Sequence, residues 1–463
     1  MPPRASLKTF LATARAALTT QSPKRSTPLT FVVGNESADL DSLCSALLLA
    51  YFQTYAPPKH RSSAGDASTS TLHIPICHLE RADLALRPEF TAVLRDGGIK
   101  GEDVFTLEDV LPSQQKETKN STKSKRNEAP VLRPEDTRWL LVDHNAMTGA
   151  LAKVFGHRVI GCVDHHADEG AVPRDAELRV IEKSGSCASL VLAQCKDVWA
   201  TLSAGNEKGE GGGDVRKDDD AQIDAQIARL ALAPILIDTT NLRDENKTTE
   251  YDRQAVALAE AKIAAAEERE DGGGMNGSGV REVDVKRYDR DAFFARLSGL
   301  KEDLSEMSFR DVFRKDYKEW SVGSLNLATS SVPRGFRYLV EEKAQGDTSK
   351  FIEALREWGG EKDAAGKMDI VVVLTGFQDG DGKFRRELLV WARSEAGVRA
   401  AKMFEERCRD TLRLETWGDG ALDEGGVGRG EWRRCWAQNA VEYSRKQIAP
   451  MLRDALKEVS EGG

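Results

Sequence analysis

Residues 158–166 have the sequence Arg-Val-Ile-Gly-Cys-Val-Asp-His-His, an apolar run that ends in an acid and two adjacent histidines. We predict a short buried strand here, because strands of a parallel sheet are covered on both faces and are apolar along their length. Ligands bind where such strands end, at the carboxyl edge of the sheet. A polar turn is the alternative for this stretch taken alone. Since the chain has only seven histidines, two together at one strand end favour a site.

The same order of apolar strand and acid occurs three more times. The runs end at positions 33, 142 and 237, and the residues that follow are Gly-Asn-Glu-Ser-Ala-Asp-Leu-Asp-Ser (34–42), Asp-His-Asn (143–145) and Asp-Thr-Thr-Asn (238–241). In a parallel sheet the four strand ends would bring carboxylates and imidazoles to one crevice. An acid in such a position can instead be a helix N-cap, and Asp41 or Ser42 fits that alternative. Four such acids together favour a shared site.

Strands alternate with helices through the first half of the chain, which predicts an α/β fold with an N-terminal doubly wound parallel sheet. The expected strands are 29–33, 71–77, 139–142, 159–163 and 235–237, and the expected helices are 41–55, 189–202, 221–232 and 249–268. Before them, apolar residues at positions 7, 10, 11, 14 and 18 have helical spacing and predict a docked helix. An amphipathic transit peptide is the alternative, because the first acid is Glu36.

The rest of the chain predicts a second, smaller α+β domain. A glycine-rich segment at 269–282 has the composition of a linker, so we expect a catalytic domain at 1–268 and a second domain at 283–463. In the second domain we expect a helix at 290–304, a strand at 325–328, paired strands at 370–374 and 387–391, and a closing helix at 436–459. Polar segments at 112–130 and 203–220 are expected to be surface insertions.

Composition excludes several classes of function. The 75 acids outnumber the 66 bases and give a net charge of −9, which argues against a general nucleic-acid binder. No apolar run reaches the roughly 18–20 residues of a membrane span. The seven cysteines are widely spaced and form no CxxC pair, which favours reduced thiols in an intracellular protein. We expect a cytoplasmic protein, with a mitochondrial one as the alternative.

The predicted site needs positive charge, because so many carboxylates cannot all stay ionised together without it. Divalent cations would supply that charge. Carboxylate and imidazole ligands suit Mn²⁺, Mg²⁺ or Co²⁺ better than they suit thiolate-seeking metals. Two such ions can hold a phosphoryl group between them during its transfer to water. The residues therefore favour a phosphate-ester or phosphoanhydride hydrolase.

With Asp164-His165-His166 and the three other strand-end segments in this order, the chain resembles the DHH phosphoesterase superfamily. It is most similar to the cytosolic exopolyphosphatase branch, with family II inorganic pyrophosphatases and prune-like proteins as close relatives. The segment 34–42 is the most specific part of the resemblance, whereas Asp-His-His alone is a weak signal. The resemblance extends over the cores of both predicted domains and leaves out the polar insertions.

The resemblance implies two metal sites in the first domain. Asp39 would bind one ion and Asp41 the other, Asp143 would bridge them, and His165 and Asp238 would complete the second site. The ions would be Mn²⁺ or Mg²⁺, with Co²⁺ as a further candidate.

Other residues around the two ions would contact phosphate or support a ligand. His166 would contact a phosphate oxygen, with His144 and Asn145 nearby, and Asp164 would orient an imidazole from behind the ligands. Most members of the superfamily have histidine where this chain has Asn35, and asparagine is a poor ligand for these metals. The exopolyphosphatase branch shares this replacement.

The second domain supplies positive charge. Segment 444–447, Ser-Arg-Lys-Gln, and segment 316–320, Asp-Tyr-Lys-Glu-Trp, resemble parts of the superfamily's second domain that bind substrate phosphate. The resemblance implies that Arg445 and Lys318 clamp the substrate, with Lys446 beside them; solvated surface charge is the alternative. Four further residues could extend a basic channel for a longer polyanion, namely Arg314, Lys315, Arg334 and Arg337.

A nucleophilic cysteine is the less favoured hypothesis for the helix start at 184–187, Ser-Gly-Ser-Cys. Backbone N–H groups there suit an anion, and relatives have a similar segment that lines the site. A buried core position is the favoured interpretation of Cys187.

Together these observations predict a metal-dependent exopolyphosphatase with Asp143, His166, Arg445 and Lys318 as its catalytic groups. Inorganic polyphosphate would be its partner, without nucleic acid or membrane, and we expect a monomer whose two domains close on the substrate. The alternatives are a pyrophosphatase of the same fold, a prune-like phosphodiesterase and a non-enzymatic interaction protein on the same scaffold.

Overall fold

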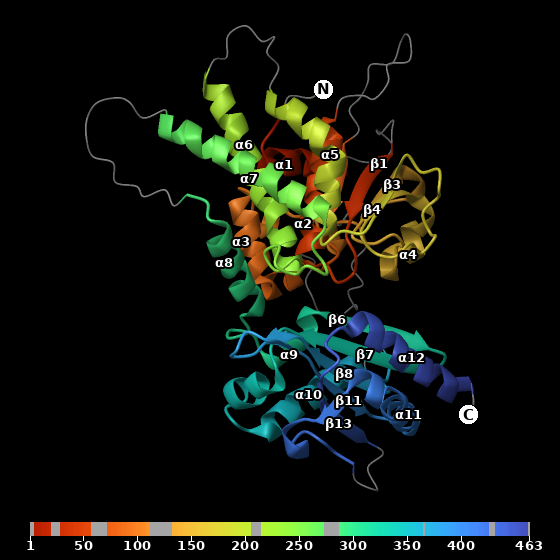
Figure 1. Ribbon diagram of the computed structural model, residues 1–463. Coiled ribbons are helices and arrows are strands. Elements are labelled where there is room, and N and C mark those ends of the chain that lie inside the picture. Colours follow the sequence, from red (N-terminus) through yellow and green to blue (C-terminus); the bar gives the residue numbers. More distant parts are fainter. Residues whose placement is uncertain are drawn as a thin grey trace, which may run out of the picture. The chain divides into compact units, whose positions relative to one another are not determined.

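The computed structural model describes residues 4–19, 28–56, 72–111, 132–204, 214–272, 287–363, 366–425 and 431–461. The insertion expected at 112–130 lies outside these residues, as do parts of the insertion at 203–220 and of the linker at 269–282. The chain forms two compact units, Met1–Leu300 and Lys301–Gly463. Figure 1 shows the helices and strands of both units.

The first unit is built on a parallel sheet. Its strands are β1 (Leu29–Val33), β2 (His73–Ile76), β3 (Thr137–Val142), β4 (Val159–Asp164) and β5 (Leu178–Ile181), in the order β2-β1-β3-β4-β5. All four neighbouring pairs are parallel. All the strands therefore have their carboxyl ends at the same edge of the sheet. The predicted parallel sheet is confirmed, and β5 was not predicted because it is a short, half-buried edge strand.

Helices cover the sheet of the first unit. They are α1 (Leu7–Thr19), α2 (Leu40–Tyr55), α3 (Pro88–Asp96), α4 (Gly149–Phe155), α5 (Cys187–Ala204), α6 (Asp214–Asp238), α7 (Glu250–Gly272) and α8 (Arg290–Glu302). Figure 1 shows α2, α5, α6 and α7 gathered beside β1, β3 and β4. The five apolar residues of α1 that have helical spacing are all buried, as expected for a docked helix.

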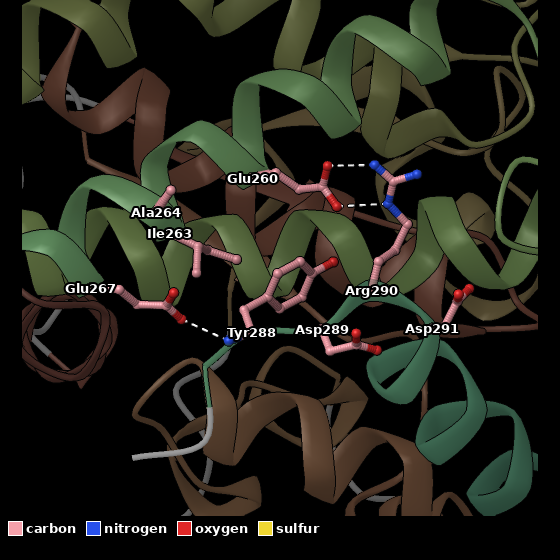
Figure 2. Close-up of a pocket in the computed structure, with 8 residues that line it drawn as sticks. All are labelled: Glu260, Ile263, Ala264, Glu267, Tyr288, Asp289, Arg290 and Asp291. Atoms are coloured by element: carbon pink, nitrogen blue, oxygen red, sulfur yellow. Dashed lines mark hydrogen bonds and ion pairs between the residues drawn. The ribbon is translucent and has the colours of Figure 1, made fainter. Parts of the chain in front are cut away.

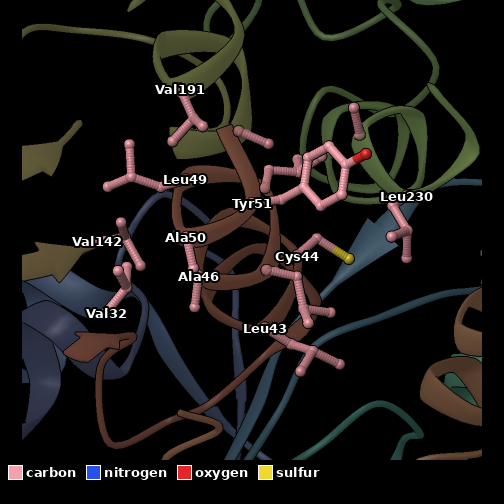
Figure 3. Packing of buried hydrophobic residues seen from close by; sticks show 14 of the residues in the cluster. Val32, Leu43, Cys44, Ala46, Leu49, Ala50, Tyr51, Val142, Val191 and Leu230 are labelled. Carbon is pink, nitrogen blue, oxygen red and sulfur yellow. The ribbon is translucent and has the colours of Figure 1, made fainter. Parts of the chain in front are cut away.

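Helix α2 is the centre of this core. Nearly all of its residues are buried, as expected for a helix that is apolar on every side. Figure 3 shows Ala46 and Ala50 of α2 close to Val32 of β1 and Val142 of β3, with α5 and α6 around the rest of the helix. Because α2 follows β1 directly, this packing fixes the loop between them at the carboxyl edge of the sheet.

The strand expected at 235–237 is wrong, because these residues form the last turn of α6. The helix continues through Pro234 to Asp238 and packs within the core, with Ile235 and Leu236 fully buried. A short apolar run does not distinguish a buried strand from a buried helix. Asp238 is thus at the end of a helix and not at the end of a strand.

The second unit is a mixed sheet with helices on both faces. Its strands are β6 (Tyr317–Val322), β7 (Leu325–Val332), β8 (Ile370–Thr375), β9 (Phe377–Gln378), β10 (Phe384–Arg385), β11 (Glu387–Ala392), β12 (Leu414–Thr416) and β13 (Trp432–Gln438). The main sheet has the order β12-β13-β11-β8-β7-β6, with β7 and β8 parallel and the other pairs antiparallel. The predicted pairing of 370–374 with 387–391 is confirmed.

The two faces of this sheet bury alternate residues. Val371 and Val373 of β8 pack in one core with α9 (Phe309–Lys315) and α10 (Thr348–Lys362). Ile370, Val372 and Leu374 pack in the other core with α11 (Glu395–Leu412) and α12 (Arg445–Glu461). The closing helix expected from position 436 is wrong at its start, because 436–438 are the end of β13, where 436 and 437 pair with β11 and 438 pairs with β12. Trp436 packs in one of these cores and its neighbour Cys435 in the other, as expected for a strand that is covered on both faces.

No helix within the described residues is long and apolar enough to cross a lipid bilayer.

The helix predicted at 290–304 corresponds to α8, and its buried residues Phe293 and Leu297 pack in the core of the first unit. The architecture is therefore a parallel α/β unit followed by a smaller unit with a mixed sheet.

Candidate metal centre

Three side chains at the carboxyl edge of the first sheet form a group that can hold a metal ion. Asp143 follows β3, and His165 and His166 follow β4, its neighbour in the sheet. One ligand atom from each residue lies within 4.8 Å of the others. The two imidazole rings are 4.4 Å apart and nearly perpendicular. The sheet order thus brings together residues that the sequence separates by 22 positions.

The two oxygens of Asp143 have different surroundings. Oδ2 accepts hydrogen bonds from the Ser42 hydroxyl at 2.6 Å and from the Asn35 amide at 2.7 Å. Oδ1 lies 3.1 Å from Nε2 of His165 and 3.7 Å from Nδ1 of His166. The backbone of Asp143 is left-handed, with φ 61°, a conformation that marks functional sites when a non-glycine residue adopts it. Oδ1 is therefore presented to the histidines while Oδ2 is held by donors.

Burial and the nearby Asp39 carboxylate raise the pKa of Asp143 to about 7, although the hydrogen bond from His165 opposes the rise. The side chain is 3% exposed, so water does little to stabilise its charge. A bound cation would stabilise the ionised carboxylate in such surroundings.

His165 is held in the tautomer that a metal ligand needs. Its Nδ1 lies 3.0 Å from the backbone carbonyl of Ser184, and since a carbonyl only accepts, Nδ1 carries a proton. Nε2 then faces Oδ1 of Asp143 at 3.1 Å and Oδ2 of Asp41 at 4.0 Å. Burial lowers the pKa of His165, but the hydrogen bond to Asp143 and the nearby acids outweigh it and raise that pKa to about 10. The ring is thus oriented with Nε2 toward the carboxylates, where a cation could replace its proton.

Asp164 holds the loop of His165 and His166 in place through hydrogen bonds. Its side chain is fully buried, and Oδ1 accepts hydrogen bonds from Nδ1 of His166 at 2.8 Å and from the backbone N–H groups of His165 and His166. Oδ2 accepts from the Asn145 amide at 2.6 Å. Asn145 also donates to the carbonyl of Ala167 and accepts from the backbone of Glu169. The imidazole that Asp164 orients is therefore that of His166, and the Asn145 amide ties the loop together.

Asp41 is buried against the start of α5 and accepts four hydrogen bonds. The donors are the Ser186 hydroxyl at 2.8 Å, the Cys187 N–H at 2.6 Å, the Ala188 N–H at 2.9 Å and the Ser45 hydroxyl at 3.1 Å. The N-cap of α2 is Asp39, which accepts from the Ser42 N–H at 3.1 Å, so neither Asp41 nor Ser42 has that role. Burial and the charge of Asp39 raise the pKa of Asp41, with His165 opposing the rise.

The other expected ligands also lie near this group. Asp39 acts electrostatically on both Asp41 and Asp143, and Asp238 acts on His165. Asp238 is the last residue of α6. Asp39 and Asp238 therefore lie near the group formed by Asp41, Asp143 and His165.

A buried histidine that was not predicted also lies at this edge. His78 comes two residues after β2, and its Nδ1 lies 3.2 Å from the carbonyl of Gly34 in the loop after β1. It acts electrostatically on His144, whose Nδ1 lies 2.9 Å from the carbonyl of Val142 and whose pKa burial lowers to about 4. A polar residue just after the strand predicted at 71–77 is the same signal that marked the other three strand ends.

Cys187 is a core residue. Its Sγ donates to the carbonyl of Val163 at 3.2 Å and accepts from the N–H of Asp143 at the same distance. Burial and the charges of Asp41 and Asp143 hold the pKa of its thiol well above the ordinary value. Since the nucleophile of a cysteine enzyme is the thiolate, these surroundings argue against that role.

In the second unit, the expected phosphate-binding cations lie at the start of α12 and of β6. Arg445, the first residue of α12, donates to the carboxylate of Asp316 at 2.7 Å and to its carbonyl at 2.9 Å. Asp316 directly precedes β6, which contains Lys318. The Arg445–Asp316 pair therefore connects two segments more than a hundred residues apart. Lys446 is exposed on the first turn of α12.

Three of the four residues that were expected to extend this basic region are engaged with other groups. Lys315 is buried and donates to the carbonyl of Lys301, Arg334 donates to the carbonyl of Glu302, and Arg337 pairs with Glu341. A separate pocket of the first unit is lined by α7 and residues 288–291. Figure 2 shows Arg290 paired with Glu260 there, and Glu267 accepting from the backbone of Tyr288.

Comparison with known proteins gives matches over most of the chain. Residues 30–235 match the family model described as DHH family, N-terminal domain, and residues 295–455 match that of the DHHA2 domain. The chain is 28% identical to the "Putative exopolyphosphatase" of Schizosaccharomyces pombe, over 93% of this chain and 91% of that protein. It is 24% identical to "Exopolyphosphatase PRUNE1" of Rattus norvegicus and 22% identical to that of Homo sapiens, in both cases over 97% of this chain and 79% of the relative.

A solved structure with a similar fold is that of a Methanococcus jannaschii protein titled "putative family II inorganic pyrophosphatase". The identity is 18% and the TM-score 0.48, over 92% of this chain and 99% of that one.

Proposed function

Since the chain consists of a DHH-family domain followed by a DHHA2 domain and has its relatives in the DHH superfamily, we propose that it is a metal-dependent exopolyphosphatase. It would remove the terminal phosphate of linear inorganic polyphosphate by hydrolysis of the phosphoanhydride bond. The observation that carries this proposal is the convergence of Asp143, His165 and His166 at one sheet edge, with Asp41 4.0 Å from His165. The names of the relatives from Schizosaccharomyces pombe and Rattus norvegicus support polyphosphate as the substrate.

The residues at this edge fit divalent metal ions. Nε2 of His165 and Oδ1 of Asp143 face each other, and their other polar atoms are held by protein partners. Asp39, Asp41, Asp143, His165 and Asp238 would hold two ions, Mn²⁺ or Mg²⁺, with Co²⁺ as a further candidate. When bound, the ions would supply Lewis acidity and lower the pKa of water.

His166 would contact the substrate. Its Nδ1 is bonded to the carboxylate of Asp164, which fixes the ring and leaves Nε2 as the atom that can reach a phosphate oxygen. A ring held in this way would direct Nε2 toward the negative charge that develops on the transferred phosphoryl group. Arg445 and Lys318 would add positive charge from the second unit, with Lys446 beside them.

Asn35 supports the exopolyphosphatase branch over a pyrophosphatase of the same superfamily. Its amide nitrogen donates to the carboxylate of Asp143 at 2.7 Å and its amide oxygen accepts from the N–H of Ser37. With these contacts the side chain acts as a donor toward an expected ligand. A non-enzymatic scaffold protein would be expected to have lost ligands, but this chain departs from the superfamily's pattern only at Asn35.

The proposal is tested by measuring orthophosphate release from linear polyphosphate with each divalent metal in turn. Release of phosphate that needs a metal supports it, and no release with any metal contradicts it.

Replacing Arg445 with alanine is expected to raise the KM for polyphosphate about 10- to 100-fold, because a charge-assisted hydrogen bond contributes roughly 1.5–3 kcal/mol. The KM of Arg445→Lys should lie between that of the unmodified chain and that of Arg445→Ala, since lysine keeps the charge but loses the planar fork. Arg453→Ala, an exposed position two turns later on α12, is the matched control. A KM for Arg445→Ala equal to that of the control would contradict the proposed contact with substrate.

A further inference from the structure

Asp252 of α7 is fully buried and accepts hydrogen bonds at both carboxylate oxygens. Three donors reach each oxygen: the Ser184 hydroxyl (3.1 Å), the Ser186 N–H (3.2 Å) and the Ser189 hydroxyl (2.7 Å) reach Oδ1, and the Gly185 N–H (2.9 Å), the Thr249 N–H (2.7 Å) and the Thr249 hydroxyl (2.8 Å) reach Oδ2. The bonds from Thr249 cap the start of α7. The other four come from a different segment, 184–189, and a helix cap does not account for them.

Segment 184–188 contacts the metal centre on its other side. The carbonyl of Ser184 accepts from Nδ1 of His165 at 3.0 Å, which fixes the tautomer of that ring. The Ser186 hydroxyl and the N–H groups of Cys187 and Ala188 donate to Asp41. The segment therefore lies between Asp252 and two of the expected metal ligands.

We propose that Asp252 is a positioning residue of the metal centre, which by holding segment 184–188 sets the tautomer of His165 and the place of the Asp41 carboxylate for a divalent cation. This inference rests on the proposed function, because it takes His165 and Asp41 to be ligands. Asp252 does not itself touch the metal or the substrate in this proposal. It acts through intervening residues that bond to Asp252 on one side and to a ligand on the other.

The packing of the segment supports this role. A side-chain Cβ at Gly185 would lie 2.9 Å from Oδ2 of Asp252 and 2.5 Å from Thr239, so the backbone sits directly on the carboxylate. Burial opposes ionisation of Asp252, but the hydrogen bonds from Ser189, Thr249 and Gly185 outweigh it and lower the pKa of its carboxyl. An ionised acceptor can hold donors on both sides at once, which a neutral side chain of the same shape cannot do.

Asparagine at position 252 is therefore the informative change. Its Nδ2 would face the Ser186 N–H if it took the place of Oδ1, or the N–H groups of Gly185 and Thr249 if it took the place of Oδ2. A hydroxyl can turn to accept, but a backbone N–H cannot. Either orientation places donor against donor and displaces the segment.

The test is a titration of the metal-free full chain with Mn²⁺ by calorimetry, which needs no substrate. Asp252→Asn is expected to weaken Mn²⁺ binding about 10- to 100-fold, as for other residues that orient metal ligands. Asp224→Asn is the matched control, because Asp224 is also buried and accepts from Arg4 and from Trp199 at 2.6 Å. It lies on α6 about 21 Å along the helix from Asp238. The control should lower the melting temperature but leave Mn²⁺ affinity within about 2-fold.

Two outcomes overturn the inference: Asp252→Asn binds Mn²⁺ like the unmodified chain, or both variants lose affinity equally. If Asp252→Asn fails to fold, Ser189→Ala removes one donor to Asp252 and is expected to weaken Mn²⁺ binding about 2- to 10-fold. Unchanged affinity in that variant also contradicts the inference. If the unmodified chain itself binds no Mn²⁺, Mg²⁺ or Co²⁺, the proposed function fails first, and the two failures are thereby distinguished.

Discussion

Replacing Asp143 with alanine is expected to lower the rate of orthophosphate release by about 1000-fold or more, which corresponds to about 4 kcal/mol of transition-state stabilisation. One oxygen of the Asp143 carboxylate faces both His165 and His166, while its second oxygen is fixed by Ser42 and Asn35. Its loss removes an expected ligand of both metal ions. It also removes the acceptor that orients the two donors.

The variant should remain folded. Alanine in the left-handed conformation of position 143 costs about 1–2 kcal/mol, but the change also removes a buried carboxylate that burial disfavours. The melting temperature separates loss of function from loss of fold. Asp168→Ala is the matched control, because Asp168 lies in the loop after β4, where it pairs with Arg179. Activity of Asp143→Ala comparable to that of this control would refute the metal centre.

Removing divalent metal is expected to abolish phosphate release and to lower the melting temperature of the chain. Burial raises the pKa of Asp41 and of Asp143, and the charge of Asp39 adds to both rises, so without a cation these carboxylates are poorly stabilised. A ligand that binds only the folded chain stabilises it by about 2.7 kcal/mol at a concentration 100 times its Kd. Adding back Mn²⁺, Mg²⁺ or Co²⁺ should restore both properties.

The measurement is phosphate release and thermal denaturation after treatment with a chelator, with the metal content of the protein determined by elemental analysis. If the metal bound elsewhere in the chain, added metal would still raise the melting temperature of the Asp143→Ala variant. We expect that variant to gain little stability from added metal. A chain that is stripped of metal and hydrolyses polyphosphate at its full rate would contradict a metal-dependent reaction.

The sheet of the first unit could be predicted because its strands are buried on both faces. β1, β3 and β4 are short apolar runs, and polar residues begin where each ends. Since all the strands are parallel, that local pattern was enough to place Asp143, His165 and the loop around Asp39 at one edge. Figure 1 shows these three strands side by side in the first unit.

Other features depend on contacts that no local pattern contains. The run that ends at Asp238 is apolar in either a helix or a strand, and only its packing within the core distinguishes them. Asp252 lies 63 residues or more from the serines that it holds, and Arg445 lies 129 residues from Asp316. Likewise, the donation from Asn35 to Asp143 could not be read from the replacement of a histidine. In each case the partner is set by tertiary structure.

The most direct test of the account compares kcat/KM for pyrophosphate with kcat/KM for linear polyphosphate of defined length, using the full chain with its best divalent metal. The account predicts the higher kcat/KM for polyphosphate, with orthophosphate as the released product and chains that shorten from the end. Faster turnover of pyrophosphate than of every polyphosphate length would contradict it and would favour a pyrophosphatase.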